Sequence, residues 1–179
     1  SALVYKKAGY QTHFIYGGDL NWRNIGKFVS HQGFDLQEGK KDILNSLNLE
    51  PEKDAHDWGV FDEYAYQYVL NILHQAKTPQ FIFLLTTNNH PPYTIPSNYQ
   101  SNTLLYSQVL KESMIGDKEL IHKRLLDYQY ALDMSGKFMD NIKQSDLGDK
   151  TVVAITADNN TIEGVIRYEN ATEESKKIP

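Results

Sequence analysis

An apolar run of strand length, "QFIFLLTT" from Gln80 to Thr87, is the feature that most constrains how this chain can fold. A continuous apolar run is typical of a strand whose two faces are both covered by helices. The segment "QTHFIYGG", which begins at Gln11, predicts another strand that ends at paired glycines. Thr151 to Ala157, "TVVAITA", predicts a third strand. The three segments together indicate one buried sheet.

Helical patterns lie between these strands. "SALVYKKAGY" predicts the end of a helix that stops at Gly9, and "NWRNIGKFVSHQGF" predicts a second helix that closes at Gly33. Asp62 is expected to cap a helix that begins near Glu63. The apolar positions of this helix have helical spacing: Tyr66, Val69, Leu70 and Leu73.

The longest helical pattern runs from about Asp117 to about Lys143. Its expected apolar side consists of Ile121, Leu125, Tyr128, Leu132, Met139 and Ile142. The polar stretch of residues 35–59 is weakly patterned and predicts a loop with a short helical turn, long enough to be an insertion near a site.

Helices that alternate with apolar strands favour an α/β layer fold with a mainly parallel sheet flanked by helices. At 179 residues, the chain is expected to form a single domain over residues 1–179. In such folds ligands gather at the carboxyl ends of the strands. Three strand ends carry the residues best suited to chemistry: "YGGD", "TTNNH" and "TADNN".

Composition excludes several classes of function. A formal net charge of -5 argues against binding nucleic acid through a general positive field. The chain has no cysteine, so any metal must be held by carboxylate, imidazole, amide or hydroxyl groups. The sequence also contains neither a dinucleotide-binding glycine pattern nor a P-loop lysine.

The candidate site residues each have a functional and a structural interpretation. Asp158 and Asn159 offer hard oxygen ligands for a divalent cation, or they form the turn after a buried strand. His90, in "NNHPPY", stands in a stiff loop that could present its imidazole to a ligand, or it bonds locally on the surface. The other histidines have no metal-ligand spacing and receive no role: His13, His31, His56, His74 and His122.

The segment "YGGDLNWRN" leaves two alternatives open. Arg23 could bind a phosphate while Trp22 forms a pocket wall, or Asp19 could cap the next helix while Trp22 enters the core. "HDWGVFDE" is compatible with packing around a buried Trp58.

Taken together and in order, six segments between Ala8 and Thr161 resemble the sulfatase branch of the alkaline phosphatase superfamily, most of all phosphoglycerol transferases of the lipoteichoic acid synthase type. The segments are "AGYQTHFIYGGDLNWRNIGKF", "GF", "DWGVFDE", "FIFLLTTNNHPPY", "DYQYALDMSGKFM" and "KTVVAITADNNT". The resemblance implies a partial alkaline-phosphatase-like three-layer fold and makes the chain the central fragment of a sulfatase-like catalytic domain.

By this resemblance, the whole protein would be a metal-dependent transferase of phosphoglycerol or a related phospho-group. The resemblance makes Asp158 and Asn159 metal ligands, His90 a substrate-pocket histidine, and Asp19, Trp22 and Arg23 part of the pocket for the glycerol phosphate head. The implied cofactor is one divalent ion, manganese or magnesium, with calcium or zinc as alternatives.

The resemblance also implies a substrate and a location. The substrate would be a phospholipid or an envelope glycan, and nucleic acid is not expected as a partner. The protein would lie at the extracytoplasmic face of a bacterial inner membrane, anchored through segments outside this chain. Two further functions stay open, a sulfatase-type ester hydrolase and a non-catalytic binding module, and a free-standing flavodoxin-like domain is a third alternative.

Two departures from the family pattern bear on these alternatives. The transferases carry Asp-His where this chain has Asp158-Asn159, whereas sulfatases carry an Asp-Asn pair that binds calcium. The family's nucleophile lies upstream of "GYQT", and Thr86 and Thr87 do not match its motif. We therefore expect the fragment alone to be inactive and to bind metal weakly.

Overall fold

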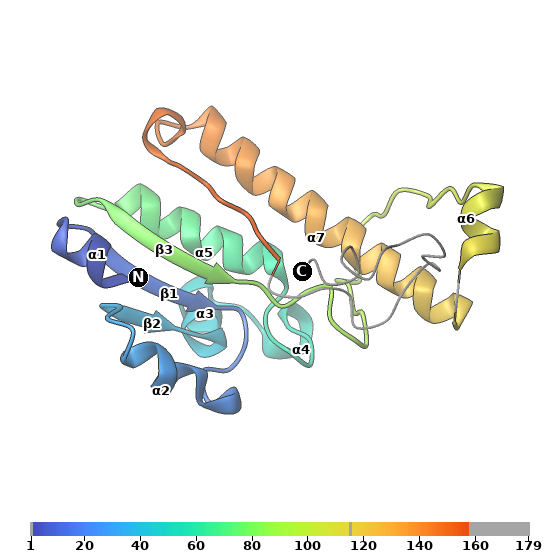
Figure 1. Ribbon diagram of the computed structural model, residues 1–179, viewed down its shortest axis with the longest axis horizontal. Helices are drawn as coiled ribbons and strands as arrows, with labels where there is room; N and C mark the ends of the chain where they lie inside the picture. The colour runs from blue at the N-terminus through green and yellow to red at the C-terminus, as the bar shows by residue number, and fades with distance from the viewer. Residues whose placement is uncertain (1, 115, 158–179) are drawn as a thin grey trace, which may run out of the picture.

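A three-stranded parallel sheet forms the centre of the computed structural model, which describes residues 2–114 and 116–157 (Figure 1). The strands are β1 (Gln11–Tyr16), β2 (Leu36–Glu38) and β3 (Gln80–Leu85), and their order is β2-β1-β3. Both pairs are parallel, with His13 opposite Leu36 on one side and opposite Ile82 on the other. The predicted parallel sheet and the strands at Gln11 and Gln80 are therefore confirmed.

Helices lie on both faces of this sheet (Figure 1). The helices of the described residues are α1 (Ala2–Lys7), η1 (Trp22–Asn24), α2 (Ile25–Ser30), α3 (Lys40–Leu47), α4 (Pro51–Asp54), α5 (Asp62–Gln75), α6 (Gln108–Ser113), α7 (Lys118–Gln144) and η2 (Gly148–Lys150). Strand residues Phe14 and Tyr16 pack with Val29 of α2. Ile15, on the opposite face, packs in the main core with residues of α3, α5 and α7. The predicted layered α/β fold is thus confirmed.

The central strand β1 is the most deeply buried part of the sheet, with every residue after Gln11 buried. The continuous apolar run of β3 predicts the same for that strand, but this is only partly so. Phe83 is exposed, because β3 stands at the edge of the sheet within the described residues.

Helix α7 exists as predicted, but its buried side differs from the expected one. Tyr128 and Leu132 are exposed, whereas Arg124 and Asp127 are buried. The buried residues still recur every three or four positions: Ile121, Arg124, Asp127, Tyr130, Met134, Phe138 and Ile142. Hydrophobic spacing cannot identify a buried arginine or aspartate. The predicted buried side was therefore wrong over the first half of the helix.

The region predicted as a loop, residues 35–59, contains β2, α3 and α4. The short β2 has no visible alternation, and its partner is the distant β1. Helix α3 begins after Gly39, whose N–H donates to the Asp42 carboxylate at 2.7 Å, and it buries Ile43 and Leu44. The predicted helix over "NWRNIGKFVSHQGF" is shorter than expected, since Arg23 and Asn24 have left-handed backbone angles before α2 begins.

The predicted strand at Thr151 to Ala157 is wrong for the structure described. None of these residues belongs to the three-stranded sheet. Val152 is 97% exposed and Ile155 71% exposed, while Val153 packs against the main core. The β-branched composition supplies strand propensity, but a strand forms only where a neighbouring edge accepts its backbone hydrogen bonds.

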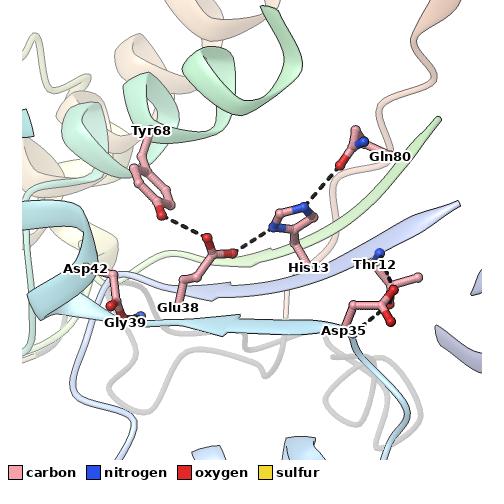
Figure 2. Close-up of polar contacts among 8 residues, drawn as sticks. All are labelled: Thr12, His13, Asp35, Glu38, Gly39, Asp42, Tyr68 and Gln80. Carbon is pink, nitrogen blue, oxygen red and sulfur yellow. Dashed lines mark hydrogen bonds and ion pairs between the residues drawn. The ribbon is translucent and has the colours of Figure 1, made fainter. Parts of the chain in front are cut away.

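A buried polar network joins the three strands to α5 (Figure 2). The Nδ1 atom of His13 lies 2.7 Å from Glu38 Oε2, and its Nε2 atom lies 3.0 Å from Gln80 Oε1. The Gln80 amide is oriented by its own N–H donation to Thr78 O at 2.8 Å. Tyr68 of α5 donates to Glu38 Oε1 at 2.8 Å. Both ring nitrogens of His13 therefore lie within hydrogen-bond distance of an oxygen, which connects β1 to β2 and to β3 through side chains.

Candidate functional site

The loops that follow β1 and β3 meet the loop of residues 55–61 around an open cavity of about 460 Å³. The lining residues come from all three loops: Tyr16, Asp19, Trp22, Asp57, Trp58, Pro91 and Pro92. The cavity lies at the carboxyl ends of two parallel strands, the edge at which ligands gather in folds of this kind. It is therefore the candidate site.

Glycines allow two of these loops to approach each other. Val60 N–H donates to Gly17 O at 2.9 Å, which draws the residue 55–61 loop onto the end of β1. A Cβ on Gly59 would overlap Gly17 O and lie 2.9 Å from Gly18 N. A Cβ on Gly18 would in turn lie 2.7 Å from Trp58 O. The Cβ-free backbone at Gly18 and Gly59 therefore sets the position of Trp58.

Two indole rings form the walls of the cavity. Trp22 and Trp58 meet edge to face with centroids 5.8 Å apart, and the guanidinium of Arg23 lies 4.9 Å from the Trp22 ring. His90 packs on the other indole, with centroids 3.9 Å apart. Trp58 Nε1–H donates to Pro91 O at 2.6 Å. The structure thus brings a cation and an imidazole to the two tryptophans.

Asp19 and Trp22 do not have the structural roles that the sequence left open. Asp19 Oδ1 accepts from Asn21 N–H at 2.8 Å and from Asn21 Nδ2 at 3.0 Å, which closes a turn and does not cap a helix. Trp22 is 42% exposed, so it lies outside the core. Arg23 follows with a φ of 47°, which turns the backbone sharply beside the cavity. The structural alternative for this segment is therefore wrong, and its role in a substrate pocket stays a prediction.

The four residues expected to bind substrate lie together around this cavity. Asp19 and Trp22 line it directly, the guanidinium of Arg23 lies over the Trp22 ring, and the His90 ring packs against Trp58 at a tilt. Asp158 and Asn159, the expected metal ligands, lie outside the described residues. The sequence interpretation missed Trp58 as a pocket wall, although its place before Gly59 in "DWGVFDE" was a usable signal.

His56 also has a place in the site that its sequence pattern did not reveal. Its Nε2 lies 3.2 Å from Thr87 Oγ1, whose own proton goes to Val60 O at 2.9 Å. Trp58 N–H points to His56 Nδ1 at 3.4 Å. Burial, followed by the charge of Lys40, lowers the pKa of His56 to about 4, so the ring is neutral at pH 7. The buried Thr87 hydroxyl thus supports the loop and is not presented to the cavity.

Two buried carboxylates support the loop that carries His90. Asp62 was predicted to cap its own helix, but its Oδ1 accepts from Thr87 N–H at 2.9 Å and from Asn88 N–H at 3.1 Å. Asp127 of α7 accepts from Asn88 Nδ2 and from Asn89 N–H, both at 2.8 Å. Asp62 is 2% exposed and Asp127 1% exposed. Burial raises the pKa of each carboxyl to about 6 against the lowering effect of these hydrogen bonds.

The raised pKa of Asp62 predicts a pH dependence of stability. A carboxyl whose folded pKa exceeds its unfolded value contributes stability that is present below about pH 4 and lost as pH rises through about 6. Replacing Asp62 with asparagine keeps an acceptor oxygen for both N–H groups and removes the titration. We expect the unfolding free energy of the wild type, relative to Asp62→Asn, to fall by about 2 kcal/mol between pH 4 and pH 7.

Urea denaturation of both proteins across this pH range would measure the difference. A difference between wild type and Asp62→Asn that does not vary with pH would contradict the prediction.

The part of the chain that the structure describes contains neither a cluster of metal-ligating side chains nor a membrane-spanning helix. Within residues 2–114 and 116–157, no three histidine, aspartate or glutamate side chains lie together as a metal site would require. The expected ligands Asp158 and Asn159 are not among these residues. No helix in the same part of the chain has the length and apolarity needed to cross a membrane.

Curated relatives of this chain are phosphoglycerol transferases. Phosphoglycerol transferase I of Xanthomonas axonopodis pv. citri is 25% identical over 157 residues, which cover 86% of this chain and 20% of that protein. Phosphoglycerol transferase I of Salmonella arizonae is 27% identical over 92 residues, which cover 50% of this chain and 12% of that protein. The chain therefore spans a fifth or less of the length of these relatives.

Two solved structures have the same fold. The lipoteichoic acid synthase LtaP from Listeria monocytogenes aligns with a TM-score of 0.64 and 21% identity, over 82% of this chain and 33% of that one. A protein in the alkaline phosphatase superfamily from Vibrio parahaemolyticus aligns with a TM-score of 0.58 and 29% identity, over 82% of this chain and 32% of that one. These matches confirm the superfamily inferred from the ordered segments.

The family comparison covers almost the whole chain. The sulfatase family model matches residues 2–179, which include every loop that lines the cavity and the segment with Asp158 and Asn159. This chain therefore belongs to the sulfatase family.

Proposed function

We propose that this chain forms the central part of the catalytic domain of a phosphoglycerol transferase, and that its cavity binds the glycerol phosphate head of the substrate. The proposal rests on the cavity that Trp22 and Trp58 line, with the guanidinium of Arg23 over the Trp22 ring and the His90 ring packed against Trp58. The relatives in Xanthomonas and Salmonella that bear the name phosphoglycerol transferase support the choice of substrate.

The chemistry of the lining suits a small polyol phosphate. Indole faces pack against carbon-bound hydrogens, and the carboxylates of Asp19 and Asp57 accept hydrogen bonds from hydroxyl groups. Carboxylates repel a phosphate, so the phosphate must lie towards the positive charge of Arg23. His90 Nδ1 is 2.9 Å from Pro91 O and donates to it, which leaves Nε2 for a ligand.

The proposal includes a divalent metal, manganese or magnesium, held by Asp158 and Asn159 together with ligands outside this chain. Oxygen ligands of this kind suit hard cations. When bound, such an ion supplies positive charge beside the phosphate oxygens and the attacking hydroxyl. The donor substrate would be a membrane lipid, the acceptor an envelope component, and the location the extracytoplasmic face of a bacterial inner membrane.

Intrinsic fluorescence offers a direct test, because the two tryptophans of the chain are the two that line this cavity. Titrating glycerol phosphate into the chain should change the tryptophan emission in a saturable way. Replacing Arg23 with glutamine should raise the dissociation constant about tenfold, since a charge-assisted contact to the phosphate is lost.

Glycerol alone and inorganic phosphate serve as ligand controls, and each should bind more weakly than glycerol phosphate. Lys27→Gln of α2 is a charge-matched control variant that should leave the affinity unchanged. The absence of a saturable change with glycerol phosphate would contradict the proposal. Tighter binding of a glycerol sulfate ester would favour the sulfatase-type hydrolase instead.

A further inference from the structure

The loop that presents His90 to the cavity is held from outside the cavity by residues of α7. Asn89 and Tyr93, at the two ends of the His90-Pro91-Pro92 turn, have φ values of 63° and 62°. Residues other than glycine rarely adopt this left-handed backbone, because the Cβ atom crowds the neighbouring carbonyl oxygen. The conformation of the turn therefore depends on contacts that hold both ends.

Helix α7 provides these contacts one turn apart. Asp127 Oδ2 accepts from Asn89 N–H at 2.8 Å, which holds the first left-handed residue. The guanidinium of Arg124 lies 5.8 Å from the ring centroid of Tyr93, the second left-handed residue. Within the turn, Tyr93 N–H donates to His90 O at 2.9 Å. Both ends of the turn are thus attached to the same buried stripe of the helix.

The attachment continues to α5 through Asn88 and to the Trp58 wall of the cavity through Pro91. Its Nδ2 donates to Asp127 Oδ1 at 2.8 Å, and its Oδ1 accepts from Asp62 N–H at 3.0 Å. From this turn, Pro91 O accepts the indole N–H of Trp58 at 2.6 Å. A displacement of the turn would therefore move His90 and Trp58 together.

We propose that Asp127 is a positioning residue, which holds the His90 turn and the Trp58 indole in the geometry that binds ligand. Asp127 lies outside the cavity lining and acts only through Asn88 and Asn89. The expected effect of Asp127 on ligand affinity rests on the proposed function. The hydrogen bonds from Asp127 to Asn88 and Asn89 do not depend on that function.

The test compares Asp127→Asn with Asp133→Asn in the same helix. Asp127 accepts hydrogen bonds on both carboxylate oxygens, whereas asparagine has one acceptor oxygen. In Asp127→Asn either the Asn88 or the Asn89 contact is therefore lost, and the new amide N–H faces another donor. Asp133 accepts one hydrogen bond, from Tyr99 OH at 2.5 Å, so Asp133→Asn is a matched control that removes the same charge, keeps an acceptor oxygen and lies away from the His90 turn. Asn88→Ala is a second route to the same change, should Asp127→Asn unfold the chain.

Two readouts separate this role from general destabilisation. In NMR spectra of the folded variants, the His90 ring and Trp58 indole signals should shift in Asp127→Asn and Asn88→Ala, and should stay in place in Asp133→Asn. The dissociation constant for glycerol phosphate should rise at least tenfold in the first two variants and stay within twofold in the control.

The outcomes distinguish the two proposals. Unshifted His90 and Trp58 signals in both Asp127→Asn and Asn88→Ala would overturn the positioning role. Shifted signals together with unchanged affinity for glycerol phosphate would also overturn it, since the turn would then not govern binding. Shifted signals in a chain whose wild type binds no glycerol phosphate would support the coupling and refute the proposed ligand.

Discussion

Replacing Gly59 with alanine is expected to lower the free energy of unfolding of this chain by about 3 kcal/mol. The added methyl group would overlap Gly17 O and lie 2.6 Å from the Gly17 carbonyl carbon. Both are backbone atoms at the end of the central strand, so neither can move away by changing a rotamer. The residue 55–61 loop would have to lift, and the Trp58 wall of the cavity would move with it. Thermal or urea denaturation would measure the loss.

Gly136→Ala is the matched control for this prediction. Gly136 is an exposed residue inside α7, and nothing lies within 4 Å of the position of its added Cβ. Alanine should stabilise the helix there by about 1 kcal/mol, because it restricts the unfolded backbone. A Gly59→Ala protein as stable as the wild type would show that the two loops do not pack as closely as described.

Replacing His13 with leucine is expected to cost about 3 kcal/mol of unfolding free energy. The imidazole is buried between Glu38 of β2 and Gln80 of β3, so its loss leaves Glu38 Oε2 without the ring nitrogen that lies 2.7 Å from it. An unpaired carboxylate in a half-buried position is costly because the protein cannot solvate it as water does. Chemical denaturation at neutral pH would measure the loss.

A second substitution tests the cause of that loss. In the His13→Leu, Glu38→Leu double variant the stranded charge is removed, and we expect at least half of the lost stability to return. Lys53, paired with Glu50 on the surface at 2.6 Å, offers a control pair, since Lys53→Leu should change stability by less than about 0.5 kcal/mol. A double variant as unstable as the single one would show that lost packing, not the unpaired charge, is responsible.

The outline of the fold was predictable because it depends on local patterns. The apolar runs at Gln11 and Gln80 and the periodicity of α5 and α7 specify strands and helices without reference to distant residues. Strand β2 was missed because it has only three residues and its partner is distant in the sequence. Leu36 of β2 pairs with His13 of β1, about 23 positions earlier. The strand at Thr151 was expected from composition, which cannot show whether a partner edge is available.

The candidate site was predictable in part, for a related reason. Asp19, Trp22, Arg23 and His90 stood in short polar segments after strand-like runs, and the ordered segments identified the family. The supporting residues could not be found in this way. His56 and Asp127 act through hydrogen bonds across 31 and 38 sequence positions, to Thr87 and Asn89, and neither stands in a local motif that predicts such a bond.

The sequence by itself determined the parallel α/β layers, the family and two residues of the cavity lining, Asp19 and Trp22, because strand and helix periodicity and ordered motifs are local properties of the chain. Only the tertiary structure decided which polar residues are buried to support that cavity. Burial of Asp62 and Asp127 is favourable only where backbone and amide N–H groups converge on them, and that convergence arises when α5, α7 and the loop after β3 pack together.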